Sequence, residues 1–252
     1  MLDTPAGLSL TTFWLLLGAA VMTGALHGAT GMAGGIVMAV ILSHFVGVKV
    51  AIPVITCALI FSHSSRVYLY RRDTQWATVG RVLLFGCPSV VLGAVIFSLI
   101  DARTVAVVFA VFLGLSIPVK RWARRQKLQT GPAMLRGASV IWGVLAGNVI
   151  GPGFFLAPFL QGLGLNRLAF VGTLASVTLV MNIVKLSVFG VTDLMNGELI
   201  LLGVCIGLAT VPGNWLGQRI LRKMDDASHG RIVDTLTVLM MLNMIYLAGT
   251  TK

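Results

Sequence analysis

The sequence predicts an all-α membrane protein that crosses the bilayer several times, and two observations support this prediction. Of the 252 residues, 57% are hydrophobic and only 11% are charged, whereas soluble domains carry about 25% charged residues. Apolar stretches near the length that crosses the hydrocarbon core recur along almost the whole chain. We therefore expect an all-α polytopic membrane protein with about 8 membrane-spanning helices plus two re-entrant half-helices, arranged as two inverted repeats.

The expected membrane segments follow one another with short connections. They cover residues 12–29, 35–46, 50–70, 76–98, 102–118, 135–151, 154–164, 166–189, 196–218 and 230–249. Segments 35–46 and 154–164 are too short to span a bilayer, so we expect re-entrant half-helices there. Each follows a glycine-rich break, HGATGMAGG from His27 to Gly35 and GNVIGPG from Gly147 to Gly153.

Basic residues are concentrated in three short clusters between apolar segments. The clusters comprise Arg66, Arg71, Arg72 and Arg81, then Lys120, Arg121, Arg124, Arg125, Lys127 and Arg136, then Arg219, Arg222, Lys223 and Arg231. Despite the net charge of +11, this is the positive-inside pattern and not the continuous basic face of a nucleic-acid-binding protein. With the clusters in the cytoplasm, the chain is a multi-pass protein of the cell (inner) membrane with both termini outside.

The sequence does not predict a signal peptide, a disulfide framework, a metal site or a nucleotide-binding site. The first residues, MLDTPAGLSLT, contain one acid and no base, so we expect no signal peptide. Cys57, Cys87 and Cys205 lie in apolar segments without a CxxC pair, so neither a disulfide framework nor a metal site is expected. The sequence has no GxxxxGK[ST] motif, which excludes ATP drive within this chain, and we expect no cofactor.

The two halves of the chain match weakly but in the same order. The matching positions are Gly24, Gly28 and Gly34 with Gly143, Gly147 and Gly153, and residues 88–96 with residues 212–220. Chance matching of common glycines is the alternative to duplication. We expect an N-terminal repeat at 1–127 and a C-terminal repeat at 128–252 within one membrane domain. Each holds an odd number of elements, so the copies insert in opposite orientations, as in many secondary transporters.

The two breaks are the expected binding site. Irregular backbone at membrane depth must be buried in protein or line a cavity. A half-helix that begins after a break directs free N–H groups and the positive end of its dipole at the break, where an anion can bind. The candidates are Gly28, Thr30, Gly31, Gly34, Gly35, Gly147, Asn148, Gly151 and Gly153. The alternative is that the glycines only let helices pack closely.

Further polar residues are candidates for the same pathway. His27 is a candidate ligand or proton carrier, with a structural role as the alternative. Lys185 lies in an apolar segment, where a charge costs about 2.5–3.5 kcal/mol, and Asn182 lies on the same helix face. His63 occupies the position equivalent to Asn182 in the first half. Snorkelling to the interface is the alternative for Lys185 and for its counterpart Arg66.

The two breaks and the helices after them resemble the TauE/SafE-like sulfite/organosulfonate exporter family, also called TSUP. The resemblance covers residues 12–248, and its motifs are GATGMAGGIVMAVIL at 28–42 and GVLAGNVIGPGFFLAPFLQGLGLNRLAFVGTLAS at 143–176. The first motif departs from the family pattern: Met32 and Ala33 interrupt the run of glycines, and the usual proline after the break is missing. The resemblance implies a secondary transporter, in the first instance an exporter, of a small sulfur-containing anion such as sulfite, sulfonate or sulfoacetate.

Other functions compete with this interpretation. An anion channel on the same scaffold, or a transporter of another small organic anion, would have the same composition. An intramembrane enzyme that uses the cysteines is disfavoured, because the chain has no motif such as GxSxG or HExxH. The expected partners are a small anionic substrate and membrane lipid, with a homodimer as a further option and no nucleic acid.

Overall fold

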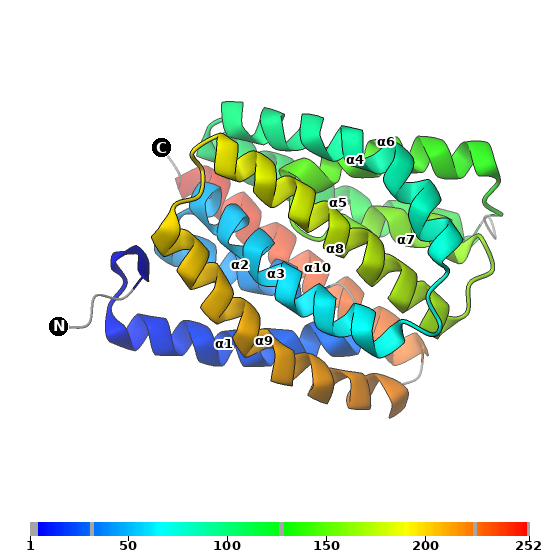
Figure 1. Cartoon of the computed structure of the whole chain (residues 1–252), viewed down its shortest axis with the longest axis horizontal. Helices are drawn as coiled ribbons and strands as arrows, with labels where there is room; N and C mark the ends of the chain where they lie inside the picture. The colour runs from blue at the N-terminus through cyan, green and yellow to red at the C-terminus, as the bar shows by residue number, and fades with distance from the viewer. Residues whose placement is uncertain (1–4, 31–32, 126–128, 224–225, 251–252) are drawn as a thin grey trace.

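The computed structural model describes residues 5–30, 33–125, 129–223 and 226–250 (Figure 1). Within these ranges the chain forms a short 3-10 turn, ten α-helices and no strand. The helices are α1 (Leu10–Thr30), α2 (Ala33–Val46), α3 (Val48–Tyr70), α4 (Trp76–Leu99), α5 (Ala102–Arg125), α6 (Pro132–Asn148), α7 (Gly153–Gln161), α8 (Arg167–Val191), α9 (Gly197–Lys223) and α10 (Asp226–Thr250). Each predicted segment corresponds to one of these helices.

Helix lengths separate spanning helices from short ones. Among the described residues, six helices are long and apolar enough to cross a membrane, namely α1, α3, α4, α5, α8 and α9. Helices α2 and α7 have 14 and 9 residues, short of the roughly 20 that spanning requires. Helix α6 has 17 residues, and an apolar stretch of α10 covers Val238–Thr250. The all-α polytopic fold is confirmed, while the number of spans stays a prediction.

Several helix ends differ from the predicted ones, and each difference has a local cause. Helices α5 and α9 continue beyond the apolar segment to Arg125 and Lys223, because charged residues outside the hydrocarbon can remain helical. Helix α6 ends at Asn148, three residues early, since Val149 is extended, with φ −127° and ψ 169°, and Gly151 then adopts a positive φ of 84°. Helix α8 begins after Asn166, whose side chain accepts a hydrogen bond from Ala169 N–H at 2.9 Å.

The helices run roughly along the long axis of the molecule, and their neighbours come from both halves of the chain (Figure 1). Helix α1 packs along α9, and α6 packs along α4. Helices α3 and α8 lie side by side between these pairs, and α5 packs against α10. The α1–α9 pair is therefore matched by the α6–α4 pair, which joins the corresponding helices of the other half of the chain.

Glycines bring the helices of the two outer pairs into backbone contact. A Cβ atom on Gly28 would overlap the carbonyl oxygen of Asn214 in α9. A Cβ atom on Gly147 would likewise overlap the backbone of Gly93 and Ala94 in α4. Neither position has room for a side chain, which is how small residues allow close helix pairs in membranes.

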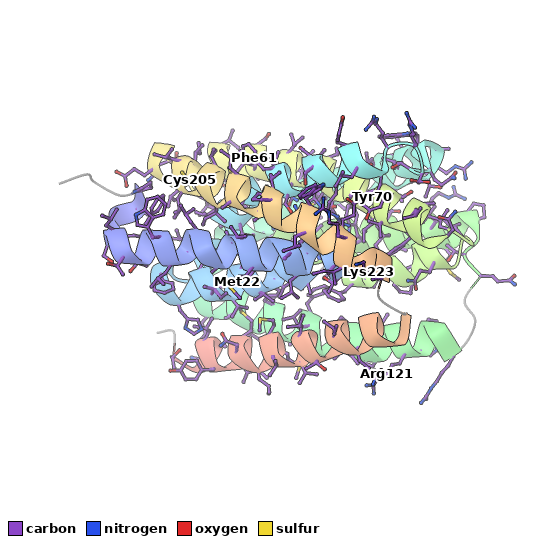
Figure 2. The ribbon with its side chains drawn as sticks, turned by 90° about the horizontal axis from the view of Figure 1, so that it is seen from below. Met22, Phe61, Tyr70, Arg121, Cys205 and Lys223 are labelled. Atoms are coloured by element: carbon purple, nitrogen blue, oxygen red, sulfur yellow. The ribbon has the colours of Figure 1, made fainter. Side chains whose placement is uncertain are left out.

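The connections that carry basic residues lie at one end of the bundle, here called the basic end. Figure 2 shows Tyr70, Arg121 and Lys223, the last residues or last turns of α3, α5 and α9, toward this same end. Helix α1 begins, and α10 finishes, at the opposite end (Figure 1). Because α6 starts where α5 stops, the second group of five helices begins at the end opposite to the first.

Candidate functional site

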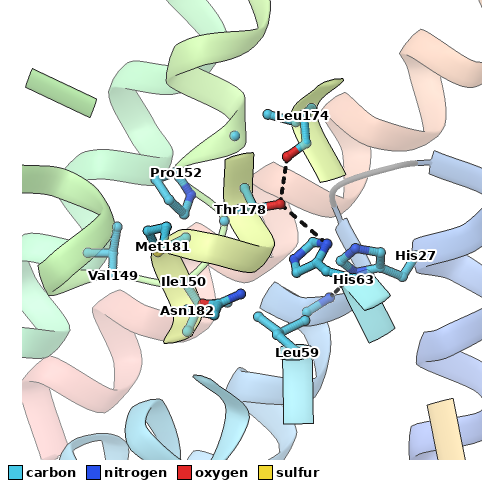
Figure 3. Close-up of a pocket in the computed structure, with 13 residues that line it drawn as sticks. His27, Leu59, His63, Val149, Ile150, Pro152, Leu174, Thr178, Met181 and Asn182 are labelled. Atoms are coloured by element: carbon cyan, nitrogen blue, oxygen red, sulfur yellow. Dashed lines mark hydrogen bonds between the residues drawn. The ribbon is translucent and has the colours of Figure 1, made fainter. Parts of the chain in front are cut away.

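A small cavity lies where the two helix breaks approach each other, between α3 and α8 (Figure 3). It is lined by His27, Gly35, Leu59 and His63 from the first half, and by Val149, Ile150, Gly151, Pro152, Gly153, Leu174, Thr178, Met181 and Asn182 from the second. Its volume is about 30 Å³, enough for about one water molecule. A sulfonate-sized anion is therefore larger than this cavity.

The second break places the N-terminus of α7, which has no side-chain cap, at this cavity. Helix α6 ends at Asn148, and α7 begins at Gly153 after the turn formed by residues 149–152. The residue before α7 is Pro152, and no side chain caps the helix. Pro152 and Gly153 line the cavity, so the positive end of the α7 dipole is presented there. The N–H groups of Phe154 and Phe155 donate to the carbonyls of Gly151 and Pro152 at 3.2 and 3.0 Å, so the backbone of the turn closes part of this helix end.

The first break is capped by side chains of α1. The N–H of Gly35 donates to Nδ1 of His27 at 3.1 Å, and the N–H of Ala33 donates to Oγ1 of Thr30 at 3.1 Å. These two bonds use N–H groups of the first turn of α2, which would otherwise be open to a ligand. The expected pair of equivalent open helix ends is thus replaced by one capped end and one without a side-chain cap.

His27 lies between two hydrogen-bond donors. Its Nδ1 accepts from Gly35 N–H, and its Nε2 lies 2.7 Å from Nη1 of Arg66. A guanidinium can only donate, and a neutral imidazole has one acceptor nitrogen, so His27 satisfies one of these donors fully and not both. The His63 ring packs edge-on against His27 with centroids 5.1 Å apart. The polar side chains on the first half's side of the cavity are therefore the imidazoles of His27 and His63, with the Arg66 guanidinium behind His27.

Lys185 and Asn182 provide the polar groups beside the second break. The Lys185 side chain is fully buried, and its Nζ donates to the carbonyl of Val149 at 3.2 Å. Asn182 is 1% exposed, and its Nδ2 has no hydrogen-bond partner in the described part of the chain. A buried donor without an acceptor costs about 1–3 kcal/mol, so an acceptor on a ligand would stabilise this site.

The comparison with known proteins gives one result. Residues 16–244, nearly the whole chain, match the family model described as sulfite exporter TauE/SafE. The chain belongs to the TauE/SafE family. No curated protein and no solved structure matches it significantly. Family membership and the helical fold together identify the chain as a membrane transporter.

In this TauE/SafE member, some predicted site residues meet at the cavity. They are His27, Gly35, His63, Gly151, Gly153 and Asn182. Lys185 and Arg66 lie one contact behind the wall, through Val149 and His27 respectively. Their complete burial does not fit snorkelling to the interface, because neither side chain reaches the protein surface. The role of each of these residues in binding stays a prediction.

Other predicted residues have structural contacts away from the cavity lining. Gly28 and Gly147 face the backbones of α9 and α4, and Gly34 packs against Thr23 and His27. Asn148 donates from Nδ2 to the carbonyl of Val144 at 3.0 Å within its own helix. Thr30 caps α2 as described above. Gly31 lies outside the described residues.

Sequence reasoning missed Thr178, which lines the cavity of this TauE/SafE protein one turn before Asn182. Its hydroxyl donates to the carbonyl of Leu174 at 2.7 Å and lies 3.3 Å from Nδ1 of His63 (Figure 3). The available signal was helical spacing, because residues four apart share a helix face. The equivalent pair in the first half, Leu59 and His63, lines the same cavity.

Proposed function

We propose that this TauE/SafE member is a secondary transporter that exports a small sulfur-containing anion, such as sulfite, a sulfonate or sulfoacetate, by alternating access. The observation that carries the proposal is the second break. There, an α7 N-terminus without a side-chain cap and the unpartnered Nδ2 of Asn182 border one cavity, with the Lys185 ammonium behind its wall. Sulfite and sulfonate oxygens accept hydrogen bonds as phosphate oxygens do, and helix N-termini bind such groups.

The charges around the cavity favour an anion over a cation or a neutral solute. Arg66 and Lys185 are both buried, one from each half of the chain, and each contacts a group that lines the cavity. No acidic residue is among the residues that line it. Burying a positive charge in a membrane protein is costly, and an anion between the two cations offsets this cost.

The size of the cavity favours a mechanism that requires movement. A volume of about 30 Å³ holds about one water molecule, so a sulfonate enters only if the surrounding helices separate. We infer two inverted repeats, 1–127 and 128–252, whose helices rock around the breaks to open the cavity to one side at a time. The basic end faces the cytoplasm of the cell (inner) membrane, and both termini lie outside.

The membrane potential supports the export direction. A potential that is negative inside moves one negative charge outward with about 2.3 kcal/mol per 100 mV, without any coupling ion. Proton coupling through His27 or His63 is the alternative source of drive, and transport that ceases when the pH gradient alone is abolished would indicate it.

The test is a flux assay in proteoliposomes with sulfite, taurine, sulfoacetate, sulfate and acetate. We expect saturable flux of one or more sulfur anions, together with counterflow when unlabelled substrate is present on the opposite side. Saturation without counterflow, or flux that does not saturate, would indicate an anion channel. Transport of acetate alone would replace the sulfur anion by another organic anion, and the absence of any anion flux or binding would refute the assignment.

A further inference from the structure

Two large apolar grooves flank helix α5, and no residue lines both a groove and the cavity at the breaks. One, of about 420 Å³, lies between α5 and α10 and is lined by Val107, Ala110, Val111, Gly114, Leu115, Met241, Ile245 and Ala248. The other, of about 410 Å³, lies between α5, α6 and α7, with Phe112, Leu145 and Phe155 among its lining residues. Each is more than ten times larger than the cavity at the breaks, and neither has a role in the proposed transport.

The two grooves share a ridge on α5. Val107, Val111 and Leu115 line both grooves and are 44%, 54% and 58% exposed. They are spaced four residues apart, so they form one stripe along the helix. The face of α5 is thus a narrow apolar ridge with a groove of nearly equal volume on either side.

The grooves lead toward the basic end. About two to three turns beyond Leu115, α5 carries Trp122 on the same side, with Arg121 and Arg125 next to it, all of them exposed. Helix α10 approaches α5 in the opposite direction, with Met241 beside Gly114, which brings the exposed Arg231 at its start to this end. Figure 2 shows Arg121 at this end, on the α5 ribbon beside α10.

We propose that this face of α5 binds one anionic phospholipid, with its two acyl chains in the two grooves and its phosphate at Arg121 and Arg125. Each groove holds about 14 groups of the size of a water molecule, which occupies about 30 Å³, so a substantial part of an acyl chain fits in each. Arginine binds phosphate through two parallel hydrogen bonds. Basic residues at the cytoplasmic ends of helices favour anionic headgroups, and Trp122 has the amphipathic ring typical of the headgroup level.

A second copy of the chain is the competing occupant of this surface, and the charges disfavour it. A two-fold interface brings the same surface of each subunit together. Copies that met along the α5 ridge in the same membrane orientation would place Arg121 and Arg125 of both chains at the same depth. Such like-charge contacts oppose association, whereas the same charges attract an anionic lipid.

The test uses two tryptophan reporter variants in vesicles of phosphatidylcholine or phosphatidylglycerol with brominated acyl chains, which quench tryptophan on contact. One variant retains Trp122 and the other retains Trp215, each with the remaining exposed tryptophans replaced by phenylalanine and the buried Trp142 kept in both. Trp215 is the matched control, because it is also 53% exposed and lies 3.6 Å from an arginine guanidinium, that of Arg219. Neither groove includes it among its lining residues.

We expect brominated phosphatidylglycerol to quench Trp122 at a mole fraction several-fold lower than brominated phosphatidylcholine, and the two lipids to quench Trp215 alike. Replacing Arg121→Gln together with Arg125→Gln should abolish the preference. Replacing Arg71→Gln and Arg72→Gln, which removes the same charge from the same end, should leave it intact. Equal quenching of Trp122 by both lipids would overturn the proposal, as would efficient cross-linking of a Val111→Cys variant to a second copy in the membrane.

Discussion

The two helix breaks have the same place in their halves, but their short helices begin in different ways. The N-terminus of α2 is closed by His27 and Thr30, which accept hydrogen bonds from its first turn. The N-terminus of α7 follows Pro152 and has no side-chain cap. Two similar glycine-rich sequences therefore produce one short helix capped by side chains of the preceding helix and one capped only by backbone carbonyls of its own turn, those of Gly151 and Pro152. From this difference we expect an anion to bind first at the second break.

The largest expected effect is on transport, from a change at the second break. Replacing Lys185→Met removes the ammonium that donates to Val149 while keeping a long side chain. Losing a charged donor costs about 1.5–3 kcal/mol, so anion flux at low substrate should fall about 10- to 150-fold. The control is Lys49→Met. Lys49 also donates to backbone carbonyls, those of Ser98 and Ile100, but it lies outside both breaks. Equal losses in both variants would contradict a special role for Lys185.

The next effect concerns a feature that the two breaks share, the close helix pair before each of them. Gly28→Ala introduces a Cβ against the backbone of Asn214, whereas Gly18→Ala on the same helix meets nothing within 4 Å. Overpacking costs about 1–3 kcal/mol, so Gly28→Ala should lower the thermal unfolding midpoint in detergent and Gly18→Ala should not. Gly147→Ala should behave like Gly28→Ala. A stable Gly28→Ala protein with altered substrate affinity would instead support the predicted role of this glycine in binding.

A smaller effect is expected from a change at Asn182, which should weaken substrate binding without lowering the stability of the protein. Asn182→Leu replaces a buried amide whose Nδ2 has no partner in the described part of the chain. Losing one hydrogen bond to an anionic ligand costs about 1.5–3 kcal/mol, so the KM for the anion should rise about tenfold or more. The unfolding midpoint should not fall, because the replaced donor has no protein partner to lose. A lower midpoint with unchanged KM would show that Asn182 is structural.

The smallest effect is expected at the capped break. Thr30→Val keeps the shape of the side chain but removes the oxygen that accepts from Ala33 N–H. Loss of such a cap costs about 1 kcal/mol, which should appear as a modest decrease in the unfolding midpoint with an unchanged KM. Thr12→Val is a suitable control, since its hydroxyl makes only an exposed contact with Ser9 at 2.8 Å among the bonds described for it. A raised KM in Thr30→Val would mean that the first break also binds substrate and that the two breaks do not differ in this role.

The helical segments and the two breaks could be predicted from the sequence because they depend on local properties. The length of an apolar stretch decides whether a helix can span a bilayer, and this separated residues 35–46 and 154–164 from the longer segments. The glycines before them, together with Pro152 in the second, identified the interruptions. Lys185 and Asn182 were recognisable because a charge within an apolar helix is expensive and because residues three apart share a face.

Tertiary structure alone decided which of these residues reach the cavity and which ones hold helices together. Gly28 and Gly147 stand in the same motifs as Gly35 and Gly153, yet they contact α9 and α4 because those helices pack beside them. His27 caps α2 only because the chain folds back on itself after α1, and Arg66 meets it from a third helix. Hydropathy and helical period describe one segment at a time. They therefore cannot predict which helices become neighbours, and it is the neighbours that give the first break its side-chain cap and leave the second without one.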